Sequence, residues 1–118
     1  MRPNLDETHQ RLFTGCRRPA RLLVFDTASG KTVASPEIVA DTDDLFYDAA
    51  RSRVYIIGGQ GFIDVLQQKD ADHYDRIARY PTPAGTRTGF FVAELGRLFA
   101  AVPHRGEQRA EILVYEAQ

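Results

Sequence analysis

The sequence has little of several residue types, and each shortage excludes a class of structure. Among 118 residues there is one cysteine, Cys16, and no tryptophan, so an intrachain disulfide framework is excluded. No apolar run approaches a membrane-spanning length, and the opening MRPNLDETHQ has no basic-then-apolar signal pattern. As written, the chain would stay in the cytoplasm. As part of a longer exported protein it would be periplasmic or extracellular, so the compartment stays open.

An excess of charge of one sign is also absent. Fifteen Lys and Arg residues face 16 Asp and Glu residues, a formal net charge of −1. This balance gives no field that attracts nucleic acid or an anionic membrane, and we expect neither as a partner. Lysine is scarce, because only Lys31 and Lys69 accompany the arginines. Such a bias is typical of a GC-rich genome, and arginine also suits planar pairing with carboxylates.

A helical pattern is missing as well. No segment combines a 3.6-residue apolar stripe with helix caps. The best candidate is KDADHYDRIARY at 69–80. Its place in a repeat predicts a long hairpin loop that enters a strand instead.

What the chain does have is a unit that occurs three times. HQRLFTGC begins at His9, RSRVYIIGG at Arg51 and LGRLFAAV at Leu95. Their arginines, residues 11, 53 and 97, are 42 and 44 residues apart, and each motif precedes a second apolar run (RLLVFD, FIDVLQ and EILVYE). Further apolar segments lie before and after these pairs. A period of this length with four short strands per unit is typical of a β-propeller blade.

The predicted fold class is therefore all-β, with four-stranded antiparallel meanders stacked as about 2.5 to 3 propeller blades. We expect a single partial propeller in which blade one spans 3–35, blade two 45–80 and an incomplete blade three 89–118. The third blade has no segment for its fourth, outer strand. The apolar and aromatic residues of the strands are expected to pack between blades.

The residues also resemble a known family. RVYIIGG, then GFIDVLQ and DRIARYPTP, and the stretch VFDTASGKTVAS at 24–35 are similar to the YVTN-type propeller repeat. The resemblance implies a WD40-like or quinoprotein-amine-dehydrogenase-like propeller of about seven blades, with many unrelated activities. This chain is less than half that length. It would be the C-terminal portion of a parent propeller, or it would close a ring by self-association, two copies supplying six blades.

Candidate binding residues lie in connections that the topology brings to one face, at the mouth of the central channel. They are Asp41, Asp43, Asp44, Arg87, His104 and Arg105. The three acids could bind a hard divalent cation, or they could cap the strand entry and pair with nearby arginines. An Asp43–Arg87 pair between blades is predicted. Arg87 could alternatively hold the carboxylate or phosphate of a ligand.

No catalytic residue and no metal-ligand set is predicted, and no cofactor is expected beyond that cation. Cys16 is expected to be a buried, inert thiol, and His9 and His73 to lie in exposed turns of the opposite face. We therefore expect a non-catalytic scaffold whose recognition loops are 16–20, 41–44, 58–61, 84–88 and 103–109. It would bind a protein or small molecule that the sequence does not identify. The alternatives are a lactonase or quinoprotein-dehydrogenase-like enzyme with a metal or cofactor at the channel mouth, and a fragment without function outside its parent.

Overall fold

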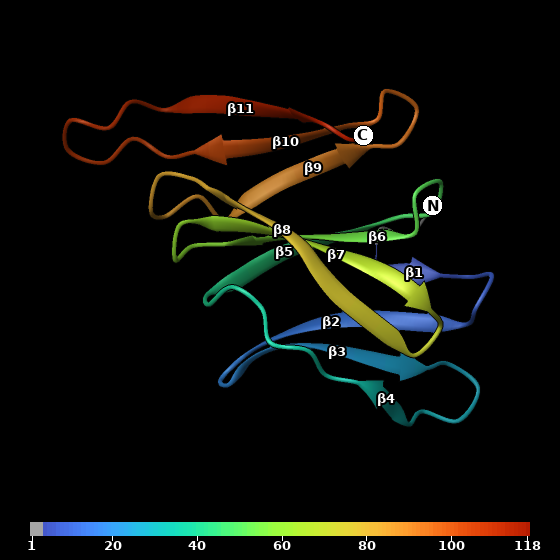
Figure 1. Cartoon of the computed structure of the whole chain (residues 1–118). Helices are drawn as coiled ribbons and strands as arrows, with labels where there is room; N and C mark the ends of the chain where they lie inside the picture. Colours follow the sequence, from blue (N-terminus) through green and yellow to red (C-terminus); the bar gives the residue numbers. More distant parts are fainter. Residues whose placement is uncertain (1–3) are drawn as a thin grey trace.

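The computed structural model describes residues 4–118, and these form three antiparallel sheets without a helix (Figure 1). Sheet 1 has the order β1–β2–β3–β4, with β1 (Leu5–Asp6), β2 (Arg11–Arg17), β3 (Ala20–Asp26) and β4 (Thr32–Ala34). Sheet 2 has the order β5–β6–β7–β8, with β5 (Thr42–Asp48), β6 (Arg53–Gly58), β7 (Phe62–Asp70) and β8 (His73–Pro81). Sheet 3 has three strands, β9 (Thr88–Val92), β10 (Arg97–Val102) and β11 (Glu111–Glu116). The predicted all-β class is confirmed.

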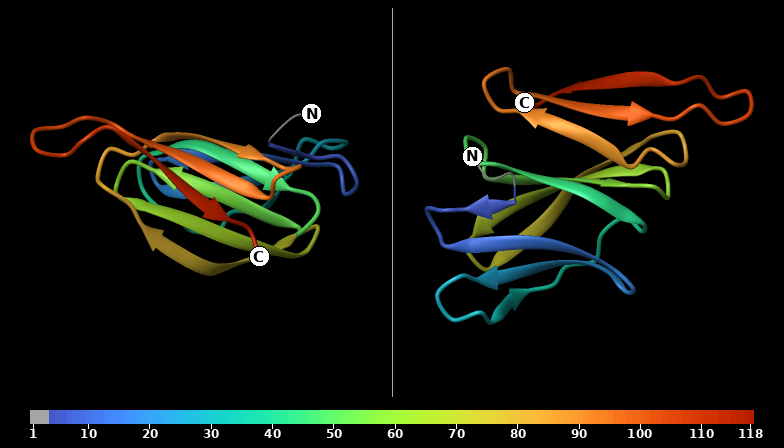
Figure 2. Two further views of the ribbon diagram at one scale, coloured as in Figure 1. Left: turned by 90° about the horizontal axis from the view of Figure 1, so that it is seen from above. Right: turned by 180° about the vertical axis from the view of Figure 1, so that it is seen from behind.

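The sheets lie one beside the next, with sheet 2 between the other two, as the views of Figures 1 and 2 agree. Each sheet is a meander in which strands adjacent in sequence are adjacent in space. In sheets 1 and 2 a fourth strand covers the edge of the third. In sheet 3 no described residue pairs with the outer edge of β11. No helix in the described part of the chain could cross a membrane.

The three sheets share one strand register, which gives the sequence repeat a structural basis. Leu12 pairs with Phe25, Val54 with Leu66, and Leu98 with Tyr115. The turns before the second strands also match. Each contains a residue with positive φ immediately before the repeated arginine: Gln10 (57°), Ser52 (55°) and Gly96 (60°). Equivalent positions can therefore be compared from sheet to sheet.

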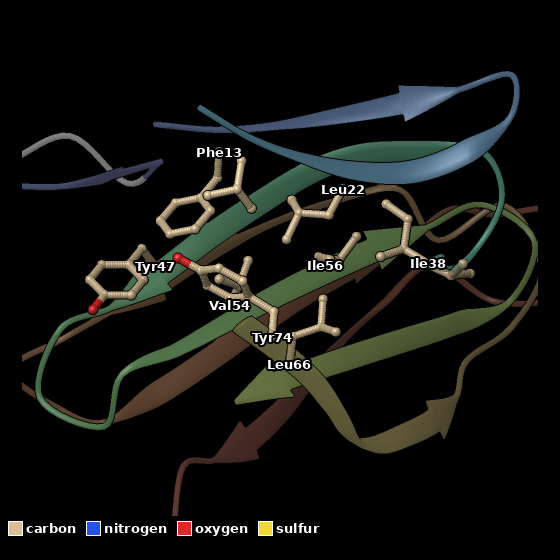
Figure 3. Close-up of a cluster of buried hydrophobic side chains, with 10 residues drawn as sticks. Phe13, Leu22, Ile38, Tyr47, Val54, Ile56, Leu66 and Tyr74 are labelled. Carbon is tan, nitrogen blue, oxygen red and sulfur yellow. The ribbon is translucent and has the colours of Figure 1, made fainter. Parts of the chain in front are cut away.

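Apolar side chains fill the junction between sheets 1 and 2 (Figure 3). Alternate residues of a strand point to opposite faces, so β2 and β3 turn one set of side chains toward sheet 2. Phe13 from sheet 1 stacks on Tyr47 from sheet 2, with ring centroids 5.2 Å apart. The buried cluster contains Phe13, Leu22, Val24, Ile38, Val39, Tyr47, Val54, Ile56, Leu66 and Tyr74.

The junction between sheets 2 and 3 uses the same positions one unit later. Tyr55, equivalent to Phe13, packs against Phe91, equivalent to Tyr47, at a centroid distance of 5.1 Å. The buried cluster contains Phe46, Tyr55, Ile57, Ile63, Val65, Leu98 and Ala100. The prediction that the strand aromatics pack between units is correct at both junctions.

Three side chains at the junction between sheets 1 and 2, those of Asp6, Tyr47 and Tyr74, are hydrogen-bonded to the buried Gln68. Its amide nitrogen donates to Asp6 Oδ2 (2.8 Å), and its oxygen accepts from the Tyr47 hydroxyl (2.7 Å). Burial raises the pKa of Tyr47, and likewise that of Tyr74, to about 12, so both hydroxyls remain donors at neutral pH. The network ties sheet 1 to sheet 2 through hydrogen bonds to the buried Asp6 carboxylate and the Tyr47 hydroxyl.

Three expectations about local structure need correction. The predicted long loop within 69–80 is a short turn, because β7 runs to Asp70 and β8 begins at His73. His73 is therefore the exposed first residue of a strand, whereas His9 lies in an exposed turn as expected. Cys16 is only partly buried, since none of residues 4–118 packs over the outer side of sheet 1. Residue 3, the predicted start of blade one, lies outside the described residues.

Candidate functional site

Five connections converge at one end of the sheets, and we call this surface the loop face. They are 18–19, 35–41, 59–61, 82–87 and 103–110. Residues predicted from the sequence to share a face meet here. Arg17 on sheet 1 donates to Asp43 Oδ1 (2.9 Å) and to the Thr42 carbonyl (3.0 Å). This contact fastens sheet 1 to the beginning of sheet 2.

The predicted Asp43–Arg87 pair is wrong, because Arg87 forms its ion pair with Asp41 instead. The pairing of β5 with β6 is irregular between Thr42 and Asp44. Asp43 is thus the extra residue of a β-bulge, which turns its side chain outward toward Arg17. Asp41 precedes the strand in the left-handed region (φ 59°), a conformation that aspartate tolerates better than most residues. Its carboxylate lies between Arg87 and Arg17, 3.8 Å from the latter.

Asp44 takes no part in these ion pairs. Its Oδ2 accepts a hydrogen bond from the backbone N–H of Gly89 in sheet 3 (3.2 Å). Burial raises the pKa of Asp44, and the neighbouring Asp43 adds to this effect, while the bond from Gly89 opposes it. Asp41 and Asp43 therefore share Arg17 as a partner, whereas Asp44 lies in a separate environment against sheet 3.

The backbone of the loop face is joined by close contacts that sequence reasoning missed. The N–H of Gly59 donates to the Asp41 carbonyl (2.9 Å), and the N–H of Gly85 donates to the Gly59 carbonyl (2.9 Å). A Cβ on Gly59 would collide with the Asp41 carboxylate and lie 3.0 Å from the Arg87 guanidinium. A side chain at residue 59 would therefore displace the Asp41–Arg87 pair, a consequence that GGQG does not reveal without its neighbours.

A shallow depression of about 410 Å³ lies at the sheet 3 side of the loop face. Arg87 and Arg105 both line it, and Arg105 reaches the Ala84 carbonyl (3.5 Å). His104 is exposed beside it. Within the described residues neither His104 nor Arg105 has an acidic partner. Arg87 already pairs with Asp41, so within the described residues Arg105 is the guanidinium of this depression that is open to a carboxylate or phosphate.

The acids are poorly placed for a metal ion. In residues 4–118 no group of three or more His, Cys, Asp or Glu side chains is arranged to hold one. Arg17, Arg87 and the Gly89 N–H engage oxygens of Asp43, Asp41 and Asp44. The geometry instead supports electrostatic joints between sheets, with positive charge left at the sheet 3 end.

A second hollow, which we call the rim groove, lies between β8 and β11, away from the loop face. It measures about 400 Å³ and is lined mainly by apolar and aromatic side chains. Tyr80 and Tyr115 approach from opposite sides, with ring centroids 5.9 Å apart. At one end the Arg53 guanidinium donates to the Gln118 carbonyl (2.6 Å). Nothing in the sequence pattern marks this groove, because it depends on which strand edge is left uncovered.

Neither a protein-family model nor a curated protein matches the sequence. The functional argument therefore rests on the repeated register and on the two surfaces described above.

Proposed function

We propose that this chain is a partial β-propeller of the YVTN-like type that acts as a non-catalytic interaction scaffold and completes its ring with another copy of itself. Support comes from the three meanders with one register, stacked side by side through equivalent apolar positions. Four-stranded meanders repeated in this way are the blades of propellers. The loop face is the proposed recognition surface, because loops on a rigid scaffold are where binding residues concentrate.

The observation that carries the proposal is the outer face of sheet 3. Three valines occupy one register position, opposite Phe13, Tyr55 and Phe99 respectively. Val24 is 0% exposed and Val65 7%, because the next sheet covers them, whereas Val114 is 53% exposed. Phe90 and Ile112 on the same face are also more than half exposed. Sheet 3 thus presents to solvent the face that corresponds to the face of sheet 1 against sheet 2 and to the face of sheet 2 against sheet 3.

The outer face of sheet 1 supplies the matching half. Leu12 and Phe25 occupy the positions of Val54 and Leu66, whose side chains cover sheet 1 at the inner junction. Leu12 and Phe25 are only partly buried. Sheet 3 of one copy can therefore meet sheet 1 of another in the way that successive sheets meet within the chain. Such head-to-tail contacts form a ring when the rotation closes and a filament when it does not.

Light scattering coupled to size exclusion, over a dilution series, tests the proposal. We expect a defined oligomer, and we expect Ile112→Asp to shift it to monomer because a charge cannot be buried in an apolar contact. Leu95→Asp is the matched control, since Leu95 is equally exposed but occupies a turn position that is not in either core cluster in the other units. A monomer at every concentration, or an equal response to both substitutions, would refute the proposal.

A further inference from the structure

We infer that the rim groove and the free edge of β11 form a docking site for an extended segment of a partner protein that carries an acidic residue and, two positions later, a tyrosine. The inference uses the equivalence of the sheets, and it does not depend on self-association. The groove lies between sheets 2 and 3, whereas the proposed contact between copies uses the opposite face of sheet 3.

The molecule already contains one filled example of this groove, between sheets 1 and 2. There the β7–β8 turn and the start of β8 cover the rim. The Tyr74 ring packs edge-on against Phe13, with centroids 5.7 Å apart, and the Tyr74 hydroxyl donates to the Ala71 carbonyl (2.8 Å). Arg11 reaches across from sheet 1 to Asp72 (2.7 Å) and to the Ala71 carbonyl (3.2 Å). An acid and a tyrosine two residues apart therefore close the first junction.

The receiving groups of that junction are repeated at the second one. Arg53 has the register position of Arg11, and Tyr55 that of Phe13. Both line the rim groove. The ring that would correspond to Tyr74 is missing, because sheet 3 has no fourth strand within the described residues. The rim groove is the space that this ring and its strand would occupy.

The polar groups at the groove are available for exchange. The Arg53 guanidinium donates to the Gln118 carbonyl (2.6 Å) and to Gln67 Oε1 (3.2 Å). The Gln67 amide oxygen is neutral, so a carboxylate would bind the guanidinium more strongly than Gln67 does. The outer edge of β11 offers backbone donors and acceptors to an added strand, a recognised mode of peptide binding in which side-chain pockets give specificity. Tyr55, Tyr80 and Tyr115 provide the aromatic pocket.

The chain supplies its own probe. A fluorophore-labelled peptide of residues 70–81, DADHYDRIARYP, contains the acid and the tyrosine in the required order. We expect a saturable rise in anisotropy on titration with the protein, and about tenfold weaker binding for peptides with Asp72→Asn or Tyr74→Ala. A scrambled peptide should not bind.

Two protein variants locate the site. Arg53→Gln should weaken the wild-type peptide about tenfold while leaving the affinity for the Asp72→Asn peptide nearly unchanged, because the two changes remove the same contact. Arg11→Gln is the matched control and should have little effect. A larger loss with Arg11→Gln would mean that the peptide displaces β8 from sheet 2, and it would overturn the inference, as would equal binding of the scrambled peptide or no binding.

The same titration in the Ile112→Asp background separates this inference from the proposed function. Peptide binding retained by a monomeric variant supports the rim groove whatever the oligomeric state of the wild-type protein. Loss of binding in that background, with the fold intact by circular dichroism, would overturn the inference.

Discussion

The three equivalent valines allow a prediction in which chemistry and register are held constant and only the neighbouring sheet changes. We consider Val24→Ala, Val65→Ala and Val114→Ala. In sheets 1 and 2 the valine is covered by the following sheet, whereas in sheet 3 the same position is open to solvent. The free energy of unfolding should therefore respond very differently to the same substitution.

The magnitude follows from burial. Removing two methyl groups from a fully buried site loses about 1.6 kcal/mol of transfer free energy at about 0.8 kcal/mol per carbon, and the residual cavity raises the loss to about 2 kcal/mol or more. Val24→Ala and Val65→Ala should both reach this value. Val114 is half exposed, so Val114→Ala should cost less than about 1 kcal/mol in a dilute, monomeric sample.

Urea unfolding monitored by far-ultraviolet circular dichroism, at two protein concentrations, provides the measurement. If another copy covers sheet 3, the destabilisation by Val114→Ala should increase with protein concentration, because association stabilises only the folded state. The changes at Val24 and Val65 should depend less on concentration. The equivalence of the sheets would be refuted if Val114→Ala were as costly as Val24→Ala at the lowest concentration, or if the two buried substitutions differed by more than about 1.5 kcal/mol.

Three further predictions concern single sites. Arg79→Ala should destabilise the chain by about 3 kcal/mol in urea unfolding, because it leaves the fully buried Asp64 carboxylate without its ion partner (2.6 Å). Arg97→Ala is the control. It breaks the exposed 3.5 Å pair with Glu116 and should cost no more than about 0.5 kcal/mol. The pKa of Asp6 is subject to burial, which raises it, but the hydrogen bonds from its neighbours outweigh burial and lower it. The contribution of Asp6 to stability should be complete above the ordinary pKa of 3.8 and lost as the pH falls through the lowered value. The Asp6→Asn variant should therefore have a lower free energy of unfolding than the wild type at neutral pH, and this difference should narrow in acid. An undiminished difference in the free energy of unfolding at low pH would contradict this. Ser52→Gly should raise the urea midpoint by the equivalent of up to about 1 kcal/mol, because glycine accepts positive φ without strain. An unchanged or lower midpoint would contradict this expectation.

Much of the fold could be predicted because short-range patterns specify it. The repeated apolar motifs around Arg11, Arg53 and Arg97 indicated one strand in each unit, and β2, β6 and β10 each contain one of these arginines. The extension of β7 to Asp70 and the start of β8 at His73 were not predicted, because DADHYD has the polar composition of a loop. Tyr74 keeps this segment in the strand by packing on Phe13, which lies far away in the sequence.

The candidate site was predictable as a neighbourhood and not as a set of pairs. The predicted blade topology brought the segments containing Asp41, Asp43 and Arg87 to one face. Which acid meets which arginine depends on the bulge at Asp43 and on the left-handed backbone of Asp41, and neither feature has a sequence signal. The partly buried state of Cys16 likewise depends on what covers sheet 1.

The position of sheet 2 between two others has a consequence for the order in which the molecule opens. Its side chains are covered on both faces, whereas sheets 1 and 3 are each covered on one. Nearest-neighbour stacking of this kind makes local stability uneven along the chain. Amide protons of β6 should exchange last, and those of β4 and β11 first. The middle meander would then be the unit from which refolding spreads outward in both directions.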